Sequence, residues 1–231
     1  MVIGIIGAMD EEIEILLKEM KNKEDITVAN CLFVKGYLSD KEAVLLKSGI
    51  GKTNAAMSTT ILHERFAPSL IINTGSAGGF QEHSNVGDIV ISTEVVYHDV
   101  DVTAFDYALG QVPGMPAAFQ SDSRLVQIAT DAVKKLKLPY AKGMVATGDS
   151  FMADPDHVAA VKKNFPDLIA AEMEAAAIAQ VCYQYNVPFV VLRALSDIAG
   201  KESSVTFDEF LETAAKNAST IVMEMVKKLG E

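Results

Sequence analysis

The sequence is short of positive charge, and of arginine in particular. It has 20 basic residues against 31 acidic ones, a formal net charge of −11, and only three arginines, Arg65, Arg124 and Arg193. A nucleic-acid binder needs a cationic face that displaces phosphate counterions, and no basic run here could form one. An acidic protein also repels polyphosphate ligands. We therefore expect a small, nearly neutral ligand and no nucleic-acid partner.

Cysteine is scarce, tryptophan is absent, and long apolar runs are missing. Cys31 and Cys182 lie far apart without CxxC spacing, which excludes a disulfide framework and a zinc site and suits a reducing compartment. No apolar stretch reaches the roughly 18–20 residues of a membrane span. The apolar N-terminus, residues 2–8, lacks the basic region of a signal peptide. These absences predict a cytoplasmic protein with no membrane partner.

What the sequence does contain is enough apolar material for a large core. Its 231 residues are 49% hydrophobic, which fits one domain, residues 1–231, of the larger α/β kind. Short apolar runs that predict strands occupy residues 2–8, 32–38, 43–47, 69–73, 88–97, 143–147, 168–170 and 188–194. Helical spacing alternates with them at residues 10–20, 53–66, 124–138, 156–164, 175–185 and 207–229. Apolar strands between helices predict a mainly parallel sheet covered on both faces.

The residues that could carry chemistry follow the ends of these predicted strands. In open α/β sheets, ligands bind beyond the carboxyl ends of the strands. Five such ends supply carboxylates, glycines and apolar or aromatic side chains, namely residues 8–12, 75–79, 148–152, 172–174 and 195–197. Each taken alone has a common structural explanation: a helix N-terminus, a tight turn or the core. Their convergence on one sheet edge is what predicts a binding site there.

Two nucleotide-binding motifs fail in the segment 48–53. The sequence Ser-Gly-Ile-Gly-Lys-Thr ends like a phosphate-binding loop, but Leu46 stands where the first glycine is required. Read as G-x-G-x-x-G from Gly49, it has Asn54 at the third glycine position.

The run at 97–101 contains His98, Asp99 and Asp101, but no third ligand cluster accompanies it, so we expect no metal site. Residues 99–123 form a long irregular segment, which is more often functional or interfacial than idle.

Taken together, five of these stretches resemble the bacterial 5′-methylthioadenosine/S-adenosylhomocysteine nucleosidases. They are residues 4–12, 71–79, 101–105, 171–175 and 193–197, including Gly-Ser-Ala-Gly-Gly, Glu-Met-Glu and Ser-Asp. The resemblance runs through essentially the whole chain. It implies the nucleoside phosphorylase fold, a three-layer α/β/α sandwich around a central mixed, twisted sheet. It also implies a homodimer with shared active sites, and no metal or organic cofactor.

The activity that the resemblance implies is hydrolysis of the N-glycosidic bond of adenine thionucleosides. Methylthioadenosine and S-adenosylhomocysteine, and also 5′-deoxyadenosine, would yield adenine and a thioribose or deoxyribose. This reaction serves methionine salvage and the recycling of S-adenosylmethionine by-products. Asp197 resembles the general acid at adenine N7, Glu12 the general base on water, and Glu174 the residue that binds the ribose hydroxyls.

The resemblance also implies a set of substrate-binding residues. Phe151 would stack on adenine and the backbone of Met152 would read the edge of the base. The other expected substrate-binding residues are Met9, Ile50, Ser76, Ala77, Gly78, Glu172, Met173, Arg193, Ser196 and Phe207. Val102, Phe105 and Pro113 are expected to reach the active site of the neighbouring subunit.

Elementary chemistry supports the acid and base assignments. Adenine leaves poorly as an anion, so the base must be protonated while a carboxylate activates water on the opposite face of the sugar, as in inverting glycosidases. Aspartic acid has a reference pKa of about 3.9, so Asp197 must be buried to act as an acid near neutrality. Its apolar neighbours Leu195 and Ile198 predict that burial.

Two other functions remain open at this point. A purine nucleoside phosphorylase shares the fold but needs a cationic phosphate pocket, and Glu12 stands where phosphate would have to bind. A non-catalytic nucleoside-binding protein of the same fold would have lost a carboxylate of the acid and base pair, whereas this chain keeps both Glu12 and Asp197.

Overall fold

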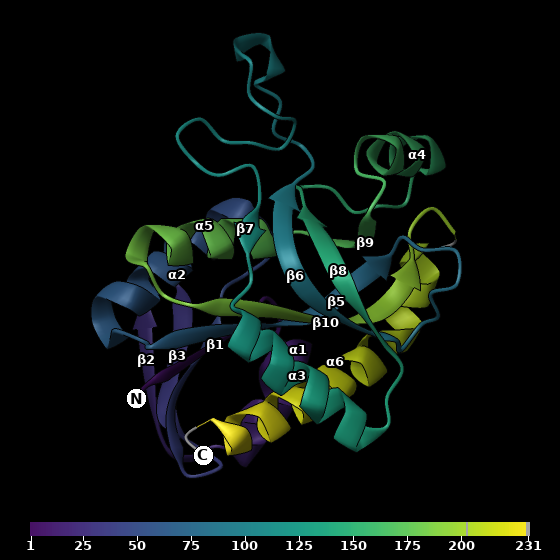
Figure 1. Ribbon diagram of the computed structural model, residues 1–231. Coiled ribbons are helices and arrows are strands. Elements are labelled where there is room, and N and C mark those ends of the chain that lie inside the picture. The colour runs from purple at the N-terminus through teal and green to yellow at the C-terminus, as the bar shows by residue number, and fades with distance from the viewer. Residues whose placement is uncertain (202, 230–231) are drawn as a thin grey trace.

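The protein is an α/β/α sandwich built around one large mixed sheet. The computed structural model describes residues 1–201 and 203–229, with the side chains of 203–205 left out. Helices α2 and α5 cover one face of the sheet, and helices α1, α3 and α6 cover the other (Figure 1). The three-layer architecture expected from the resemblance is confirmed.

The described strands are β1 (Ile3–Gly7), β2 (Lys21–Val28), β3 (Cys31–Leu38), β4 (Lys41–Lys47), β5 (Leu70–Gly79), β6 (Ile89–Tyr97), β7 (Phe119–Gln120), β8 (Tyr140–Thr147), β9 (Leu168–Glu172) and β10 (Phe189–Ile198). The helices are α1 (Asp10–Glu19), α2 (Lys52–Phe66), α3 (Ser123–Leu136), α4 (Pro155–Asn164), α5 (Ala175–Tyr185) and α6 (Ser203–Lys228), with one 3₁₀ turn, η1 (Thr103–Phe105). Among these described residues, no helix is both long and apolar enough to cross a membrane.

The sheet is more mixed than the apolar runs predicted. Strand β1 pairs in parallel with β4 and β5, and β5 pairs in parallel with β10. Strand β6 is antiparallel to β10, and β9 is antiparallel to β5, so these strands and β8 close into a ring. The sheet is therefore mixed, as the resemblance implied: the mainly parallel arrangement predicted from the apolar runs holds from β4 through β1 and β5 to β10, and the antiparallel pairings lie around it.

Strand β2 was not predicted. Its sequence, Lys-Asn-Lys-Glu-Asp-Ile-Thr-Val, lies at the edge of the sheet with mostly exposed side chains, so it carries no apolar run. It pairs with β3, and β3 with β4, through two-residue turns at Ala29-Asn30 and Ser39-Asp40. All four turn residues have positive φ, as the tight hairpin turns that match strand twist require.

Two strands run further than predicted, and this places part of the site inside the sheet. Residues 75–79 were expected to form a loop after a strand, but they belong to β5. Ser196 and Asp197 likewise lie within β10, which pairs in parallel with β5 through a bulge between Leu195 and Asp197. The predicted strand ends were wrong here because glycine, serine and aspartate end the apolar pattern, whereas the backbone hydrogen bonds between β5 and β10 continue through them.

Residues 99–123 form the irregular segment that the sequence predicted. Apart from η1, the short β7 and Ser123, where α3 begins, they contain no regular element. The segment projects from the top of the molecule in Figure 1, beyond the end of β6. Phe105 at its η1 turn is 74% exposed, which is unusual for a large apolar side chain.

Candidate active site

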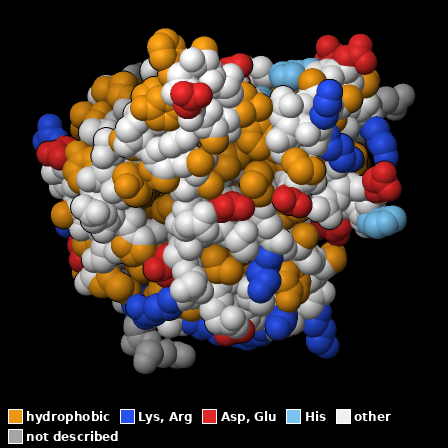
Figure 2. All heavy atoms as spheres, turned by 45° about the horizontal axis from the view of Figure 1, so that its top comes forward, with side chains coloured by type: hydrophobic (Ala, Val, Ile, Leu, Met, Phe, Trp, Pro, Cys, Tyr) orange, Lys and Arg blue, Asp and Glu red, His pale blue; other side chains and the backbone are white. Residues whose placement is uncertain are grey.

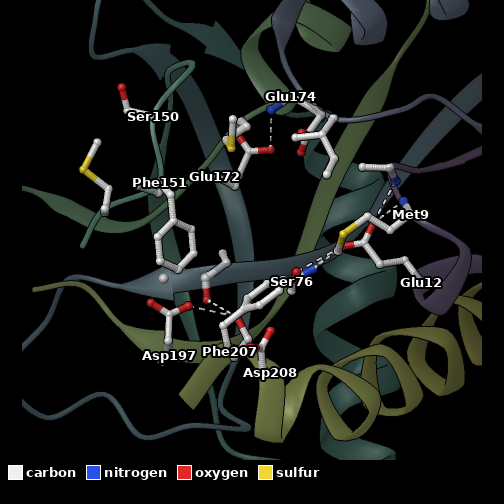
Figure 3. Close-up of a pocket in the computed structure, with 18 residues that line it drawn as sticks. Met9, Glu12, Ser76, Ser150, Phe151, Glu172, Glu174, Asp197, Phe207 and Asp208 are labelled. Carbon is white, nitrogen blue, oxygen red and sulfur yellow. Dashed lines mark hydrogen bonds between the residues drawn. The ribbon is translucent and has the colours of Figure 1, made fainter. Parts of the chain in front are cut away.

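A cavity of about 320 Å³ lies where β1, β5, β9 and β10 end (Figure 3). The residues predicted from sequence that line it are Met9, Glu12, Ile50, Ser76, Ala77, Gly78, Phe151, Met152, Glu172, Met173, Glu174, Ser196, Asp197 and Phe207. The sequence did not single out four others, Ala8, Ser150, Ala171 and Asp208. Three of these adjoin predicted residues, whereas Asp208 had no signal beyond the helical pattern of α6.

Glu12 is held at one end of the cavity by four hydrogen-bond donors. Its Oε2 accepts from the backbone N–H groups of Ala8 (2.7 Å) and Met9 (3.3 Å). Its Oε1 accepts from the backbone N–H (2.9 Å) and the hydroxyl (3.1 Å) of Ser76. The side chain is buried in the first turn of α1, where unpaired N–H groups favour a carboxylate. Glu12 therefore joins α1 to β5 and keeps one orientation in the cavity.

The backbone of β5 passes so close to Glu12 that only glycine fits at position 75. A Cβ on Gly75 would lie 2.6 Å from Glu12 Oε1 and 2.7 Å from Arg193 Nη1. The glycine-rich stretch is thus used for close approach within a strand, and this approach brings the Ser76 donors within reach of Glu12.

Arg193 lies behind the cavity and is not among its lining residues. It is fully enclosed on β10, where its Nη2 donates to Glu172 Oε2 (2.5 Å) and to Asn73 Oδ1 (2.9 Å). The same nitrogen lies 3.7 Å from Glu174 Oε2. One buried cation therefore serves two buried carboxylates, and breaking such a pair leaves an uncompensated charge.

Glu172 and Glu174 differ in how they are bonded. Glu172 accepts from Thr147 and from the backbone N–H groups of Glu174 (3.0 Å) and Ala175 (2.8 Å). Glu174 receives one N–H, from Gly51 (2.9 Å), and faces the cavity. Burial and the charge of Glu172 raise the pKa of Glu174 above that of an ordinary glutamate. Glu174 is thus the carboxylate with unused hydrogen-bonding capacity.

Asp197 lies at the other end of the cavity from Glu12 (Figure 3). It is 2% exposed, and its Oδ1 accepts from the Ser196 hydroxyl at 2.9 Å. Burial raises its pKa, although the Ser196 hydrogen bond acts in the opposite direction. The burial predicted from its apolar neighbours is confirmed, so Asp197 holds a proton to higher pH than an exposed aspartate does.

The remaining cavity wall is apolar and aromatic. The rings of Phe151 and Phe207 lie edge to face with centroids 5.8 Å apart, and Phe151 points toward Asp197 (Figure 3). Phe151 is 46% exposed, so its ring is open to a flat ligand. Within the described part of the chain, no lysine, arginine or histidine side chain lines this cavity. The site is thus largely apolar, with carboxyl groups at defined positions.

Val102, Phe105 and Pro113 do not line the cavity of their own chain. They lie on the projecting segment 99–123, at the end of the molecule where hydrophobic side chains gather on the surface (Figure 2). Their expected role in a neighbouring subunit stays a prediction.

Comparison with known proteins identifies the family of this chain. The chain matches the family model of the phosphorylase superfamily over residues 2–227, so it belongs to that superfamily. The 5′-methylthioadenosine/S-adenosylhomocysteine nucleosidase of Oceanobacillus iheyensis is 62% identical over 99% of this chain and 100% of its own length. That of Anoxybacillus flavithermus is 64% identical, with 99% of each chain covered.

Solved structures agree. The nucleosidase of Neisseria meningitidis in complex with methylthio-immucillin-A superimposes with a TM-score of 0.97 at 46% identity and 99% coverage of both chains. That of Colwellia psychrerythraea in complex with adenine also has a TM-score of 0.97, at 48% identity, and covers 99% of this chain and 96% of its own. The chain belongs to the 5′-methylthioadenosine/S-adenosylhomocysteine nucleosidase family, and it is an enzyme, a hydrolase of N-glycosyl compounds.

Proposed function

We propose that the protein hydrolyses the N-glycosidic bond of 5′-methylthioadenosine and S-adenosylhomocysteine, releasing adenine. The observation that carries the proposal is the placement of Glu12 and Asp197 at opposite ends of one largely apolar cavity, with Glu174 opening into it as well (Figure 3). The names of the related nucleosidases, and their complexes with methylthio-immucillin-A and with adenine, support the same substrate class.

Asp197 is the proposed general acid. As the bond to the sugar breaks, adenine takes up electron density, and a proton delivered to N7 turns it into a neutral leaving group. The pKa of Asp197, raised by burial, supports this role because the carboxyl group keeps its proton nearer to neutral pH. The Ser196 hydroxyl orients the carboxyl through Oδ1, so Oδ2 remains for the base.

Glu12 is the proposed general base. Departure of adenine leaves positive charge on the ribose, and water must attack the face opposite to the leaving group. A carboxylate there orients this water and accepts its proton as the new C–O bond forms. Glu12 keeps a fixed orientation through its four donors, which supports that role. Because its negative charge repels phosphate, we favour hydrolysis over phosphorolysis.

Glu174 is proposed to bind the ribose hydroxyls. It receives only one backbone N–H, so its oxygens can accept hydrogen bonds from hydroxyl groups in the cavity. These bonds strengthen as positive charge develops on the sugar, and binding that strengthens in the transition state accelerates the reaction. Burial and the charge of Glu172 raise the pKa of Glu174, and hydrogen bonds from the ribose hydroxyls would favour its ionised form.

The apolar wall is proposed to bind the two ends of the nucleoside. Phe151 stacks on adenine while the backbone of Met152 reads its edge. The 5′ substituent is surrounded by Met9, Ile50, Met173 and Phe207, all four of which line the same cavity. An apolar pocket with no required polar partner tolerates loss of the methylthio group, so we include 5′-deoxyadenosine among the substrates.

A second copy of the chain is proposed to complete the 5′ pocket. Phe105, 74% exposed on the projecting segment, is the side chain best placed to enter a neighbouring cavity. A homodimer would bury it together with Val102 and Pro113. Phe105→Ala should then raise the KM for methylthioadenosine, and size-exclusion chromatography with light scattering would show a dimer. A monomeric, fully active protein would contradict this part of the proposal.

The central experiment measures adenine release from methylthioadenosine in phosphate-free buffer, with and without added phosphate. Wild type should turn over equally in both, and Asp197→Asn and Glu12→Gln should each lose about 10²- to 10⁴-fold in kcat, the range of a general acid or base. Asp131→Asn, an exchange on α3 far from the cavity, is the matched control. A strict phosphate requirement with a sugar phosphate as product would make the enzyme a phosphorylase and our role for Glu12 wrong.

A further inference from the structure

Three residues that do not line the cavity form a closed hydrogen-bonded network beside it. Lys52 Nζ donates to Asp99 Oδ2 at 2.6 Å, and the same oxygen accepts the backbone N–H of Asp149 at 3.0 Å. Asp149 Oδ1 in turn accepts the backbone N–H of Lys52 at 2.8 Å. The network therefore joins three segments: Lys52 begins α2, Asp99 lies two residues after the end of β6, and Asp149 lies in the loop after β8.

The network is more than a surface ion pair. The side chains of Lys52 and Asp99 are only 24% and 27% exposed, whereas that of Asp149 is 49% exposed. Lys52 Nζ also lies 5.5 Å from the ring centroid of Tyr97 and 3.9 Å from the second oxygen of Asp149. Burial acts to raise the pKa of Asp99, but the Lys52 and Asp149 hydrogen bonds outweigh it and lower that pKa. Exposed pairs with one contact contribute little, whereas partly buried charges with several partners fix geometry.

The network reaches the site through Gly51. The N–H of Gly51 donates to Glu174 Oε1 at 2.9 Å, and Gly51 has no side chain with which to cap α2. Asp149 provides that cap from another segment. Asp149 lies so close to Gly51 that a Cβ on Gly51 would be 3.1 Å from Asp149 Oδ1, and Gly51 has a φ of +92°. We therefore expect the position of the Gly51 N–H to depend on the two hydrogen bonds of Lys52, from its backbone to Asp149 and from its side chain to Asp99.

The same network touches the other end of the site. Asp149 is followed directly by residues 150–152, all of which line the cavity and include Phe151. The loop that carries the aromatic ring and the N–H that holds Glu174 are therefore anchored to the same lysine. No other described contact with Glu174 comes from α2 or from the loop before it.

We propose that Lys52 and Asp149 are positioning residues for the hydrolysis: they hold the Gly51 N–H against Glu174 and so orient the carboxylate that binds the ribose. This rests on the proposed role of Glu174. The alternative is that the network only stabilises the start of α2, in which case its loss would lower thermal stability and leave the chemistry intact.

The test starts with Lys52→Met and Asp149→Ala in the full chain. Each should lower kcat/KM for methylthioadenosine by about 10- to 100-fold, the usual cost of a displacement of about 1 Å at a catalytic site. Lys52→Arg should retain most activity because it keeps the cation, and Asp149→Asn because it keeps Oδ1 as an acceptor. Lys35→Met, which breaks the Lys35–Glu42 pair (3.3 Å) between β3 and β4, is the matched control and should match wild type.

A double-mutant cycle with Glu174→Ala, which removes the oxygen that accepts the Gly51 N–H, separates positioning from stability. If Lys52 acts through Glu174, adding Lys52→Met to Glu174→Ala should cause little further loss, because the interaction is already gone. If the fold-losses in kcat/KM of the two single variants instead multiply in the double variant, at temperatures where all variants are folded, the inference is overturned. If Lys52→Met does not fold, the same cycle with Asp149→Ala decides.

Failure of this inference and failure of the proposed function give different results. An inactive wild type, or a Glu174→Ala variant with full activity, would contradict the proposed function itself. An active wild type with an impaired Glu174→Ala, together with Lys52→Met and Asp149→Ala variants as active as Lys35→Met, would reject only the positioning role.

Discussion

The carboxylate of Glu12 accepts both the backbone N–H and the hydroxyl of Ser76, a residue 64 positions further along the chain. This double contact joins the first helix to the central strand β5 and aims one oxygen of Glu12 along the cavity.

Ser76→Ala removes the hydroxyl donor but keeps the backbone N–H. A hydrogen bond to a charged group contributes about 1.5–3 kcal/mol, so kcat should fall by about 10- to 100-fold. Steady-state adenine release measures this. Ser123→Ala, at the exposed start of α3, is the control and should have no effect. Full activity of Ser76→Ala would mean that the backbone donors alone orient Glu12.

Gly75→Ala introduces a methyl group 2.6 Å from Glu12 Oε1 and 2.7 Å from Arg193 Nη1. The strand or the two side chains must shift, which should cost about 1–3 kcal/mol of stability and displace Glu12. We expect a lower Tm and at least a 10-fold loss of kcat. Gly87→Ala is the comparison, because its Cβ would meet nothing within 4 Å and only its positive φ is strained. Gly87→Ala should lower the Tm and leave kcat unchanged.

Ser196→Ala should move the pH dependence of the reaction. The Ser196 hydroxyl lowers the pKa of Asp197, against the larger effect of burial, so its loss raises that pKa further. A general acid works while protonated, so activity falls as pH rises through its pKa. The basic limb of the profile of kcat against pH should therefore shift to higher pH in the variant. An unchanged or lower limb would argue against Asp197 as the proton donor.

Asp197→Asn should lose about 10²- to 10⁴-fold in kcat and yet be more stable than wild type at neutral pH. The folded-state pKa of Asp197 lies above its unfolded value of about 3.9, so between these two values the native state binds more protons than the unfolded state. Stability from this group is therefore lost as pH rises through the folded pKa. The amide does not ionise and avoids that loss. Thermal unfolding at several pH values should show a difference in Tm that grows with pH; a constant or reversed difference would contradict it.

Phe151→Ala should weaken nucleoside binding. Stacking of a base on an aromatic ring contributes about 1–3 kcal/mol, which corresponds to a rise in KM of about 5- to 150-fold. Phe151→Tyr keeps a flat ring and should retain most of the binding. Phe210→Ala, a partly exposed phenylalanine of α6, is the matched control. A KM unaffected by Phe151→Ala would show that this ring is only a cavity wall.

The sequence alone predicted the helices and most strands, because apolar periodicity depends on burial along one segment. It also predicted one sheet edge as the site from the stretches 8–12, 75–79, 148–152, 172–174 and 195–197, and members of all five line the cavity. Ile50 and Phe207, which line it too, were implied by the family resemblance alone. It could not predict β2, whose exposed edge position needs no apolar run. Nor could it predict Asp208, which lines the cavity only because α6 begins beside it.

Local pattern and residue type thus determined which segments of this protein are strands and helices and which carboxylates could do chemistry. The tertiary structure decided strand direction, the continuation of β5 and β10 through the site, and the placement of Arg193 behind Glu172 rather than in the cavity. It also decided the Lys52–Asp99–Asp149 network. These features join residues far apart in sequence, and such contacts depend on the packing of the whole sheet, which no local pattern contains.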